Sequence, residues 1–279
     1  MGTARRRVGI ALSGGGARGL AHIGVLKVLE GAGVPIDALA GTSMGGLVAA
    51  AYACGLAPAA LEQEALHMAS LRRLLTLADP TLPRRGLFEG QKVREYLAAR
   101  LGDRDFGELR LPLTLVAVDL NTGSEVHLRQ GRVADAVRAT IALPGIFMPV
   151  ERDGQLLVDG GVLNNLPANV VRQMGADVVI AVDVAMSIGM ISSITESLRQ
   201  RRYVPEGLME TVEVLYRSLG VMMAEIQRRR LAEAQPEVLI TPALPAGVTV
   251  LTGFRRAAEI IAVGEEAARQ ALPRILDLL

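Results

Sequence analysis

A serine stands between two glycines in Gly41-Thr42-Ser43-Met44-Gly45. This is the G-x-S-x-G pattern, in which a nucleophilic serine occupies a tight turn between a strand and a helix. Glycine is favoured beside the serine because the backbone of such a turn is crowded. Residues 44–54 are rich in Ala, Leu and Val, and they predict a helix whose positive N-terminal end lies beside Ser43. Ser43 is therefore the candidate nucleophile, although small-residue turns also form for packing reasons alone.

A glycine-rich loop is the second element that could do chemistry. Ser13-Gly14-Gly15-Gly16-Ala17-Arg18-Gly19 follows an apolar run over 8–12 and precedes a helical pattern over 20–30. Such a loop points successive N–H groups at a helix N-terminus, where they can bind an anion or the oxyanion that forms in an ester reaction. Arg18 could orient this loop or attract an anionic headgroup.

The same loop has a second functional interpretation, because Gly14, Gly16 and Gly19 satisfy the G-x-G-x-x-G pattern of dinucleotide sites. That fingerprint also requires an acidic residue roughly 20 positions further on, at the end of the next strand. Asp37 is near that place, but it precedes the serine turn instead of closing a strand. A purely structural glycine turn is the third interpretation. The sequence favours an oxyanion loop over both.

A serine nucleophile needs a base, and the chain has three histidines: His22, His67 and His127. The α/β-hydrolase order of serine, acid and histidine is absent, because no histidine follows His127. Asp159-Gly160-Gly161 follows the apolar run 156–158, which places a carboxylate at the end of a buried strand. The economical alternative is a dyad in which Asp159 accepts the Ser43 proton directly. The structural interpretation is an aspartate that closes a turn or caps a helix.

The dyad requires a buried Asp159, because a carboxylate with an ordinary pKa of about 3.9 is a weak base and burial raises that pKa. Negative charge that develops on the substrate also requires hydrogen-bond donors. We expect the backbone N–H groups of four residues to be these donors: Gly14, Gly15, Gly16 and Met44. Four other glycines are expected to support the two turns: Gly41, Gly45, Gly160 and Gly161.

The composition indicates a folded α/β protein. The chain has 279 residues, half of them apolar, and a net charge of +1, which argues against binding nucleic acid through general basicity. Residues 38–61 carry no charge, but glycines and a proline interrupt them, so a buried turn and helix is favoured over a membrane span. Cys54 is the single cysteine, which excludes an intrachain disulfide and fits a reducing compartment. We expect a cytoplasmic protein, either soluble or attached to the periphery of a membrane.

Apolar periodicity predicts the elements that must position these residues. Strands are expected over 8–12, 156–158 and 177–183, with an antiparallel pair over 113–120 and 125–128. Helical patterns cover five further segments: 44–54, 58–75, 91–101, 133–143 and 254–272. Asn165 and Pro167 predict a helix that begins with an asparagine cap and an early proline.

With these residues identified, the chain resembles the patatin-like phospholipases of the compact bacterial type, which are related to the catalytic domain of neuropathy target esterase. The family pattern is G-G-G-x-[RK]-G, G-x-S-x-G and D-G-[GA], and residues 14–19, 41–45 and 159–161 match it in that order. The stretch Ala142-Leu143-Pro144-Gly145-Ile146-Phe147 also agrees. Where relatives often have serine before this Pro-Gly, the chain has Thr140, which leaves the dyad untouched. The resemblance covers residues 8–183.

The resemblance implies a three-layer α/β fold with a central, mainly parallel or mixed sheet flanked by helices. It also implies a serine lipid acyl hydrolase of the phospholipase A, lysophospholipase or esterase type, which needs no metal and no organic cofactor. Ser43 would form an acyl-enzyme from a phospholipid or lysophospholipid ester, with Asp159 as the base. A non-enzymatic lipid-binding or regulatory adaptor is the alternative, and a dinucleotide-binding oxidoreductase is a weaker one.

The rest of the chain carries no further motif. We expect one domain over 1–279, with a core over 8–183, a Met-rich helical region over 186–235 and a C-terminal strand and helix over 236–279. Methionine is adaptable, so the Met-rich region suits either a lid over the acyl chain or ordinary core packing. Apolar residues at spacings of four and three predict an amphipathic helix over 208–226: Leu208, Val212, Leu215, Leu219, Met222 and Ile226. This seam could pack on the rest of the chain, form a homodimer or contact an anionic membrane surface.

Overall fold

The computed structural model describes residues 5–70, 76–80, 86–185, 206–249 and 252–279. Within the helix that begins at residue 206, the side chains of residues 206–213 and 216 are not described. The predicted lid-like segment over 186–205, with Met186 and Met190, lies outside the described residues, as does the 71–75 end of the predicted helix over 58–75.

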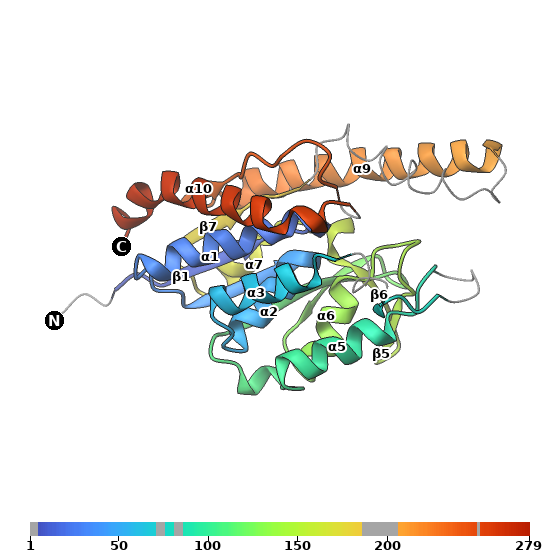
Figure 1. The fold of residues 1–279 in the computed structure, drawn as a ribbon, viewed down its shortest axis with the longest axis horizontal. Helices are drawn as coiled ribbons and strands as arrows, with labels where there is room; N and C mark the ends of the chain where they lie inside the picture. Colours follow the sequence, from blue (N-terminus) through green and yellow to red (C-terminus); the bar gives the residue numbers. More distant parts are fainter. Residues whose placement is uncertain (1–4, 71–75, 81–85, 186–205, 250–251) are drawn as a thin grey trace.

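Strands of the described residues form one mixed sheet (Figure 1). Hydrogen-bonded neighbours run β5-β6-β3-β2-β1-β7-β8, and β4 pairs with β3. Strands β1, β2, β3, β7 and β8 pair in parallel, whereas β4 and β6 run antiparallel to β3, and β5 runs antiparallel to β6. The bounds are β1 Val8–Leu12, β2 Ala38–Thr42, β3 Leu113–Asp119, β4 Ser124–Leu128, β5 Val150–Arg152, β6 Gln155–Asp159, β7 Val178–Val182 and β8 Val238–Ile240.

The register around β3 brings two strand ends together. Residues 115–119 of β3 pair with β4, so their other edge is available for β2 and β6. On that edge, Thr42 at the end of β2 lies opposite Val116, and Asp159 at the end of β6 lies opposite Ala117. Because β2 is parallel and β6 antiparallel to β3, the two strands meet with their carboxyl ends facing each other.

Helices cover both faces of the sheet, which confirms the three-layer α/β prediction. The larger hydrophobic cluster joins one face to α1, α2, α3, α5, α6 and α10, and the smaller joins the other face to α7 and α9. Their bounds are α1 Ala21–Gly31, α2 Ser43–Ala53, α3 Pro58–Met68, α5 Gln91–Leu101, α6 Val133–Thr140, α7 Ala168–Gln173, α9 Glu206–Ala234 and α10 Ala257–Leu276.

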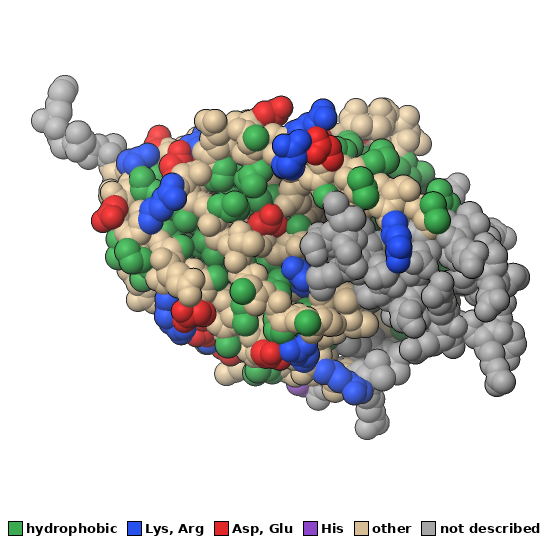
Figure 2. All heavy atoms as spheres, turned by 90° about the horizontal axis from the view of Figure 1, so that it is seen from above, with side chains coloured by type: hydrophobic (Ala, Val, Ile, Leu, Met, Phe, Trp, Pro, Cys, Tyr) green, Lys and Arg blue, Asp and Glu red, His purple; other side chains and the backbone are tan. Residues whose placement is uncertain are grey.

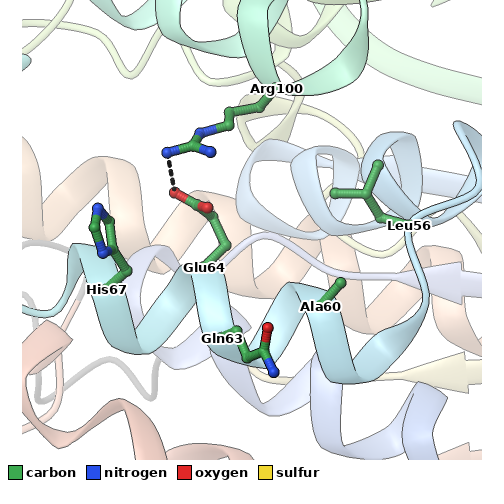
Figure 3. A pocket seen from close by; sticks show the side chains of 6 residues that line it. All are labelled: Leu56, Ala60, Gln63, Glu64, His67 and Arg100. Carbon is green, nitrogen blue, oxygen red and sulfur yellow. Dashed lines mark ion pairs between the residues drawn. The ribbon is translucent and has the colours of Figure 1, made fainter.

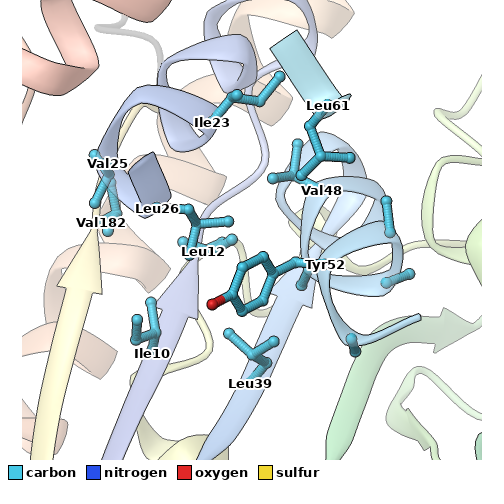
Figure 4. Close-up of a cluster of buried hydrophobic side chains, with 14 of the residues drawn as sticks. Ile10, Leu12, Ile23, Val25, Leu26, Leu39, Val48, Tyr52, Leu61 and Val182 are labelled. Atoms are coloured by element: carbon cyan, nitrogen blue, oxygen red, sulfur yellow. The ribbon is translucent and has the colours of Figure 1, made fainter. Parts of the chain in front are cut away.

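Alternation along the buried strands decides which residues enter each layer. Within β1, Ile10 and Leu12 point into the larger cluster, whereas Ala11 joins the smaller one. Figure 4 shows Ile10 and Leu12 packed with Leu39 of β2 and Leu26 of α1. On the opposite face, a Cβ on Gly9 of β1 would lie 2.1 Å from a side-chain carbon of Val171, so this glycine lets α7 approach the sheet closely.

The predicted seam of helix α9 only partly describes how this helix packs. Its C-terminal half packs through Leu231 and Ala234 beside α7. Leu215 and Met222 of the seam are 63% and 61% exposed, so the interpretation that the seam packs on the rest of the chain is wrong at these two positions. Figure 2 shows hydrophobic side chains over the part of α9 that extends past α10. Within the described ranges, no helix is both long and apolar enough to cross a membrane.

The close contact between helices α1 and α10 can be tested by substitution. Helices α1 and α10 cross at Gly24 and Gly264, where a Cβ on either glycine would collide with the backbone of the partner helix. We expect Gly264→Ala to lower the free energy of unfolding by about 1–3 kcal/mol, the usual range for overpacking. Urea denaturation measures this loss.

Gly31→Ala is the matched control, because Gly31 is also helical and nothing lies within 4 Å of its Cβ position. Its stability should stay level or rise by up to about 1 kcal/mol, since alanine is the better helix former. Equal stability of the Gly264 and Gly31 variants would contradict the close helix contact.

Candidate active site

Ser43 occupies a strained turn between β2 and α2. Its φ is +54°, in the left-handed region that residues other than glycine seldom adopt. The flanking glycines are required by packing: a Cβ on Gly41 would lie 2.6 Å from the Cα of Gly46, and one on Gly45 would lie 2.5 Å from the Ser13 carbonyl oxygen. The turn therefore presents the serine at the N-terminal end of α2, as the G-x-S-x-G pattern predicts.

Thr140 fixes this turn from the end of α6. The backbone N–H of Ser43 donates to Thr140 Oγ1 at 2.9 Å, and that hydroxyl donates to the Val116 carbonyl oxygen at 2.5 Å. Thr140 is fully buried, so both bonds are shielded from water. In the sequence, Thr140 stands only as a departure from the serine that relatives often have, and no local pattern indicates that it binds the Ser43 N–H.

Asp159 stands at the end of β6, directly across the strand junction from the serine turn. It is 3% exposed, and its Oδ1 accepts a hydrogen bond from the Gly161 N–H at 2.8 Å. Burial raises the pKa of Asp159 to about 6, although hydrogen bonds from Ser43 and from the Gly161 amide act in the opposite direction. The structure thus brings Ser43 and Asp159 together and buries the carboxyl.

The glycine loop lies against the serine turn. A Cβ on Gly14 would lie 3.0 Å from the Ser43 Cβ, so the loop passes directly beside the nucleophile. The Gly14 N–H already donates to the Asn165 carbonyl oxygen at 3.1 Å. Within the described residues, the N–H groups of Gly15 and Gly16 have no protein acceptor, so these two are the better candidate donors of the loop. Met44 lies at the second position of α2, beside the serine.

Arg18 anchors this loop to the end of β7 and to a C-terminal loop. It is 9% exposed, and its guanidinium donates to the carbonyl oxygens of Val184 at 2.8 Å, Ala185 at 3.1 Å and Val248 at 3.5 Å. Burial lowers the pKa of Arg18, and the charge of nearby Asp183 opposes that shift. Of the two predicted roles, these contacts fit the one in which Arg18 orients the loop.

The histidines do not replace the carboxylate. His22 is fully buried and its Nε2 donates to the Ser13 carbonyl oxygen at 2.8 Å, which holds the start of the glycine loop. Burial lowers the pKa of His22 to about 4, so it is neutral at pH 7. His127 pairs with Glu125 on β4. His67 lines a shallow pocket between α3 and α5 (Figure 3). Within the described residues, no histidine forms a hydrogen bond with Ser43.

Asn165 does not cap a helix, contrary to the sequence prediction. Helix α7 begins after Pro167 and has no side-chain cap. The Asn165 amide instead donates to the Gly14 carbonyl oxygen at 3.4 Å and to Gln227 Oε1 at 3.0 Å. A Cβ on Gly161 would lie 3.0 Å from Asn165 Oδ1, so this amide sits between the glycine loop and the turn that follows Asp159.

Asp37 is placed where it cannot serve a nucleotide at the glycine loop. Its carboxylate binds the Arg5 guanidinium at 2.6 Å and the Val8 N–H at 2.7 Å, at the amino ends of β1 and β2. The glycine loop follows the opposite, carboxyl end of β1. The arrangement therefore lacks the acidic ribose ligand that a dinucleotide site requires.

The role of Thr140 can be tested with two substitutions. Thr140→Val keeps the shape but leaves the Ser43 N–H and the Val116 carbonyl unpaired, so we expect a loss of about 1–3 kcal/mol in stability and slower reaction of Ser43 with a fluorophosphonate. Thr140→Ser keeps the hydroxyl and should cost only about 1 kcal/mol for the lost methyl, with the labelling rate preserved. A valine variant that labels as fast as wild type would contradict the role.

Asp159 makes stability depend on pH. Its pKa is raised from 3.8 to about 6, so protonation favours the folded state; this contribution is complete below about pH 4 and is lost as the pH rises through 6. Asp159→Asn should therefore be more stable than wild type at pH 8, by at most about 2–3 kcal/mol, with the difference shrinking towards pH 4. Urea denaturation between pH 4 and 8 measures this. A difference that stays constant with pH would contradict a raised pKa.

Comparison with known proteins identifies the family of this chain. A family model described as patatin-like phospholipase matches residues 10–172. An uncharacterized NTE family protein of Mycobacterium bovis is 39% identical over 183 residues, which covers 65% of this chain and 50% of that protein. Patatin-like phospholipase domain-containing protein 6 of Mus musculus is 39% identical over 181 residues, which covers 63% of this chain and 13% of that protein.

The chain thus spans half or less of the length of these two relatives. Among solved structures, VipD from Legionella pneumophila aligns with a TM-score of 0.49 at 13% identity, over 97% of this chain and 67% of that chain. The family model covers more than half of the 279 residues and includes the glycine loop, the serine turn and the Asp159 turn. The chain belongs to the patatin-like phospholipase family.

Proposed function

We propose that this chain hydrolyses carboxylic esters of phospholipids or lysophospholipids, with Ser43 as the nucleophile and Asp159 as its base. Family membership supports hydrolysis of lipid esters in general. The observation that carries the residue assignment is the meeting of β2 and β6 along β3, which brings the serine turn against a buried carboxyl. Burial raises the pKa of this carboxyl to about 6, a suitable value for a base near neutral pH.

In the first step, Ser43 Oγ attacks the carbonyl carbon of the ester while its proton passes to Asp159. The Gly161 N–H, which donates to Oδ1, holds the carboxylate in place for this transfer. The carbonyl oxygen becomes an oxyanion, which the N–H groups of Gly15, Gly16 and Met44 would stabilise. The bond to the leaving alcohol then breaks, and the alcohol oxygen takes the proton from Asp159. This leaves an acyl ester on Ser43 and an ionised Asp159.

Water completes the cycle. A water molecule gives a proton to Asp159 as its oxygen attacks the acyl carbon, and the same donors hold the second oxyanion. The bond to Ser43 Oγ then breaks, the serine recovers its proton from Asp159, and a fatty acid leaves. The preset turn at Ser43 and the fixed glycine loop reduce the rearrangement that each step requires.

Two other functions were open from the sequence. The position of Asp37 argues against a dinucleotide-binding oxidoreductase, because its carboxylate lies at the wrong end of β2 and is held by Arg5. A non-enzymatic adaptor would share this fold and is separated from an enzyme by activity alone. Contact with a membrane surface and a homodimer through residues 208–226 also stay proposals, and the exposed apolar side chains of α9 are available to either.

Covalent labelling tests the proposed dyad. A fluorophosphonate should add once to the wild-type chain by intact mass and not to Ser43→Ala. Asp159→Asn should lower turnover of a p-nitrophenyl ester by about 10²–10⁴-fold, the usual contribution of a positioned base. Wild-type kcat/KM should rise about tenfold per pH unit below pH 6 and level off above it, because only ionised Asp159 accepts a proton.

Asp153→Asn is the matched control, since Asp153 is 84% exposed in the turn before β6 and already adopts a positive φ that asparagine tolerates. It should retain wild-type turnover. A folded wild-type chain that neither labels nor turns over esters would instead favour the adaptor. Equal turnover of wild type and a folded Asp159→Asn variant would exclude Asp159 as the base.

A further inference from the structure

Helix α9 presents three side chains to the active site from one face. Met223, Gln227 and Arg230 are spaced by four and three residues, so they lie on one side of the helix. The Met223 methyl lies 3.5 Å from the position that a Cβ on Gly161 would occupy, next to Asp159. None of the three is among the apolar residues of 208–226 whose spacing predicted this helix. The face that turns to the rest of the chain therefore carries two polar side chains, Gln227 and Arg230, beside apolar ones.

Gln227 connects this helix to the glycine loop. Its Oε1 accepts from Asn165 Nδ2 at 3.0 Å, and its Nε2 donates to Asp183 Oδ2 at 2.7 Å. Both ends of the Gln227 amide are thereby used, which fixes the orientation of the Asn165 amide. Asn165 in turn binds Gly14 twice, because its backbone carbonyl accepts the Gly14 N–H and its side chain donates to the Gly14 carbonyl oxygen.

Arg230 connects the same helix to the serine turn. Its guanidinium binds Glu125 Oε2 at 2.6 Å, and Glu125 Oε1 accepts from Asn164 Nδ2 at 2.8 Å. The Asn164 backbone carbonyl accepts the Thr42 hydroxyl at 2.8 Å, directly before Ser43. Glu125 and Asn164 are largely withdrawn from water, so this ion pair is less screened than one on the surface.

Two adjacent asparagines are thus connected to residues one helical turn apart on α9: Asn165 directly to Gln227, and Asn164 through Glu125 to Arg230. We propose that Gln227 and Arg230 are positioning residues that hold the oxyanion loop, through Asn165, and the nucleophile turn, through Asn164, in their reactive geometry. This inference rests on the proposed hydrolase function. Neither residue touches the reacting atoms. Loss of either should therefore act on the chemical step, because small displacements of donors or nucleophile lower kcat more than they lower substrate binding.

Kinetics of Gln227→Leu test the first contact. We expect kcat for a p-nitrophenyl ester to fall by about tenfold or more while KM changes by less than about twofold. Gln270→Leu is the matched control, because Gln270 lies on α10 with only an exposed partner, Glu266. Arg230→Met should behave like Gln227→Leu, Arg230→Lys should recover part of kcat by keeping the charge, and Arg229→Met on the exposed face should behave like wild type.

A double-mutant cycle tests whether Gln227 acts through Asn165. In an Asn165→Ala background, Gln227→Leu should lower kcat by no more than about twofold further, because its partner is already gone. Two effects that multiply in full would overturn the proposal. So would an unchanged kcat in Gln227→Leu, or a loss of kcat equal to that of Gln270→Leu.

Hydrogen exchange provides a readout that does not depend on turnover. The backbone amide of Gly14 should exchange faster in Gln227→Leu than in wild type or Gln270→Leu, because its bond to the Asn165 carbonyl oxygen opens more often. Exchange that is identical in all three proteins would overturn the inference even where esterase activity is present. A wild-type chain without ester turnover would reject the proposed function, and the exchange experiment would still decide whether α9 holds the loop.

Discussion

The end-to-end meeting of β2 and β6 on one edge of β3 is the constraint on which the rest of the site depends. Strand pairing at Val116 and Ala117 sets the separation of the serine turn and Asp159, because adjacent residues of β3 hold the two strand ends. The Val116 carbonyl, left between the two strands, accepts the Thr140 hydroxyl that also binds the Ser43 N–H. The relative placement of the serine turn and Asp159 is therefore set by backbone pairing within a buried sheet.

This arrangement is energetically unfavourable at two residues, Ser43 and Asp159. Ser43 adopts a φ that is unfavourable for a side chain, and Asp159 is withdrawn from water in a setting that disfavours its charge. Both costs are tolerated because the surrounding packing leaves no alternative: backbone crowds the Cβ positions of Gly41 and Gly45, and β3 pairs on both edges. The raised pKa that weakens folding at high pH is also the property that the proposed function requires of Asp159.

Local sequence patterns predicted much of the fold and identified the turns at Ser43 and Asp159 that the structure brings together, but they did not predict the long-range polar contacts. The strand over 8–12 and the helix over 91–101 appear with the predicted bounds, since apolar periodicity and glycine boundaries are local signals. The contacts of Thr140, Asn165 and Gln227 were not predicted, and Asn165 was wrongly predicted as a helix cap, because each residue binds a partner about 60 or more residues away. The prediction that the α9 seam packs on the rest of the chain is wrong at Leu215 and Met222, because periodicity predicts a helix but does not say which of its faces meets the core.

The C-terminal part of the chain adds a strand to the sheet and contacts the residues that hold the glycine loop. The family model ends at residue 172, yet β8 pairs with β7 beyond that point, and Asp183 receives Gln227 where β7 ends. Arg18 of the glycine loop donates to carbonyls at the same strand end and to Val248. The glycine loop is thus held on one side by the matched core and on the other by Val184, Ala185 and Val248, with Gln227 acting through Asn165. These contacts connect the C-terminal part of the chain to the glycine loop by hydrogen bonds that involve residues outside the three motifs.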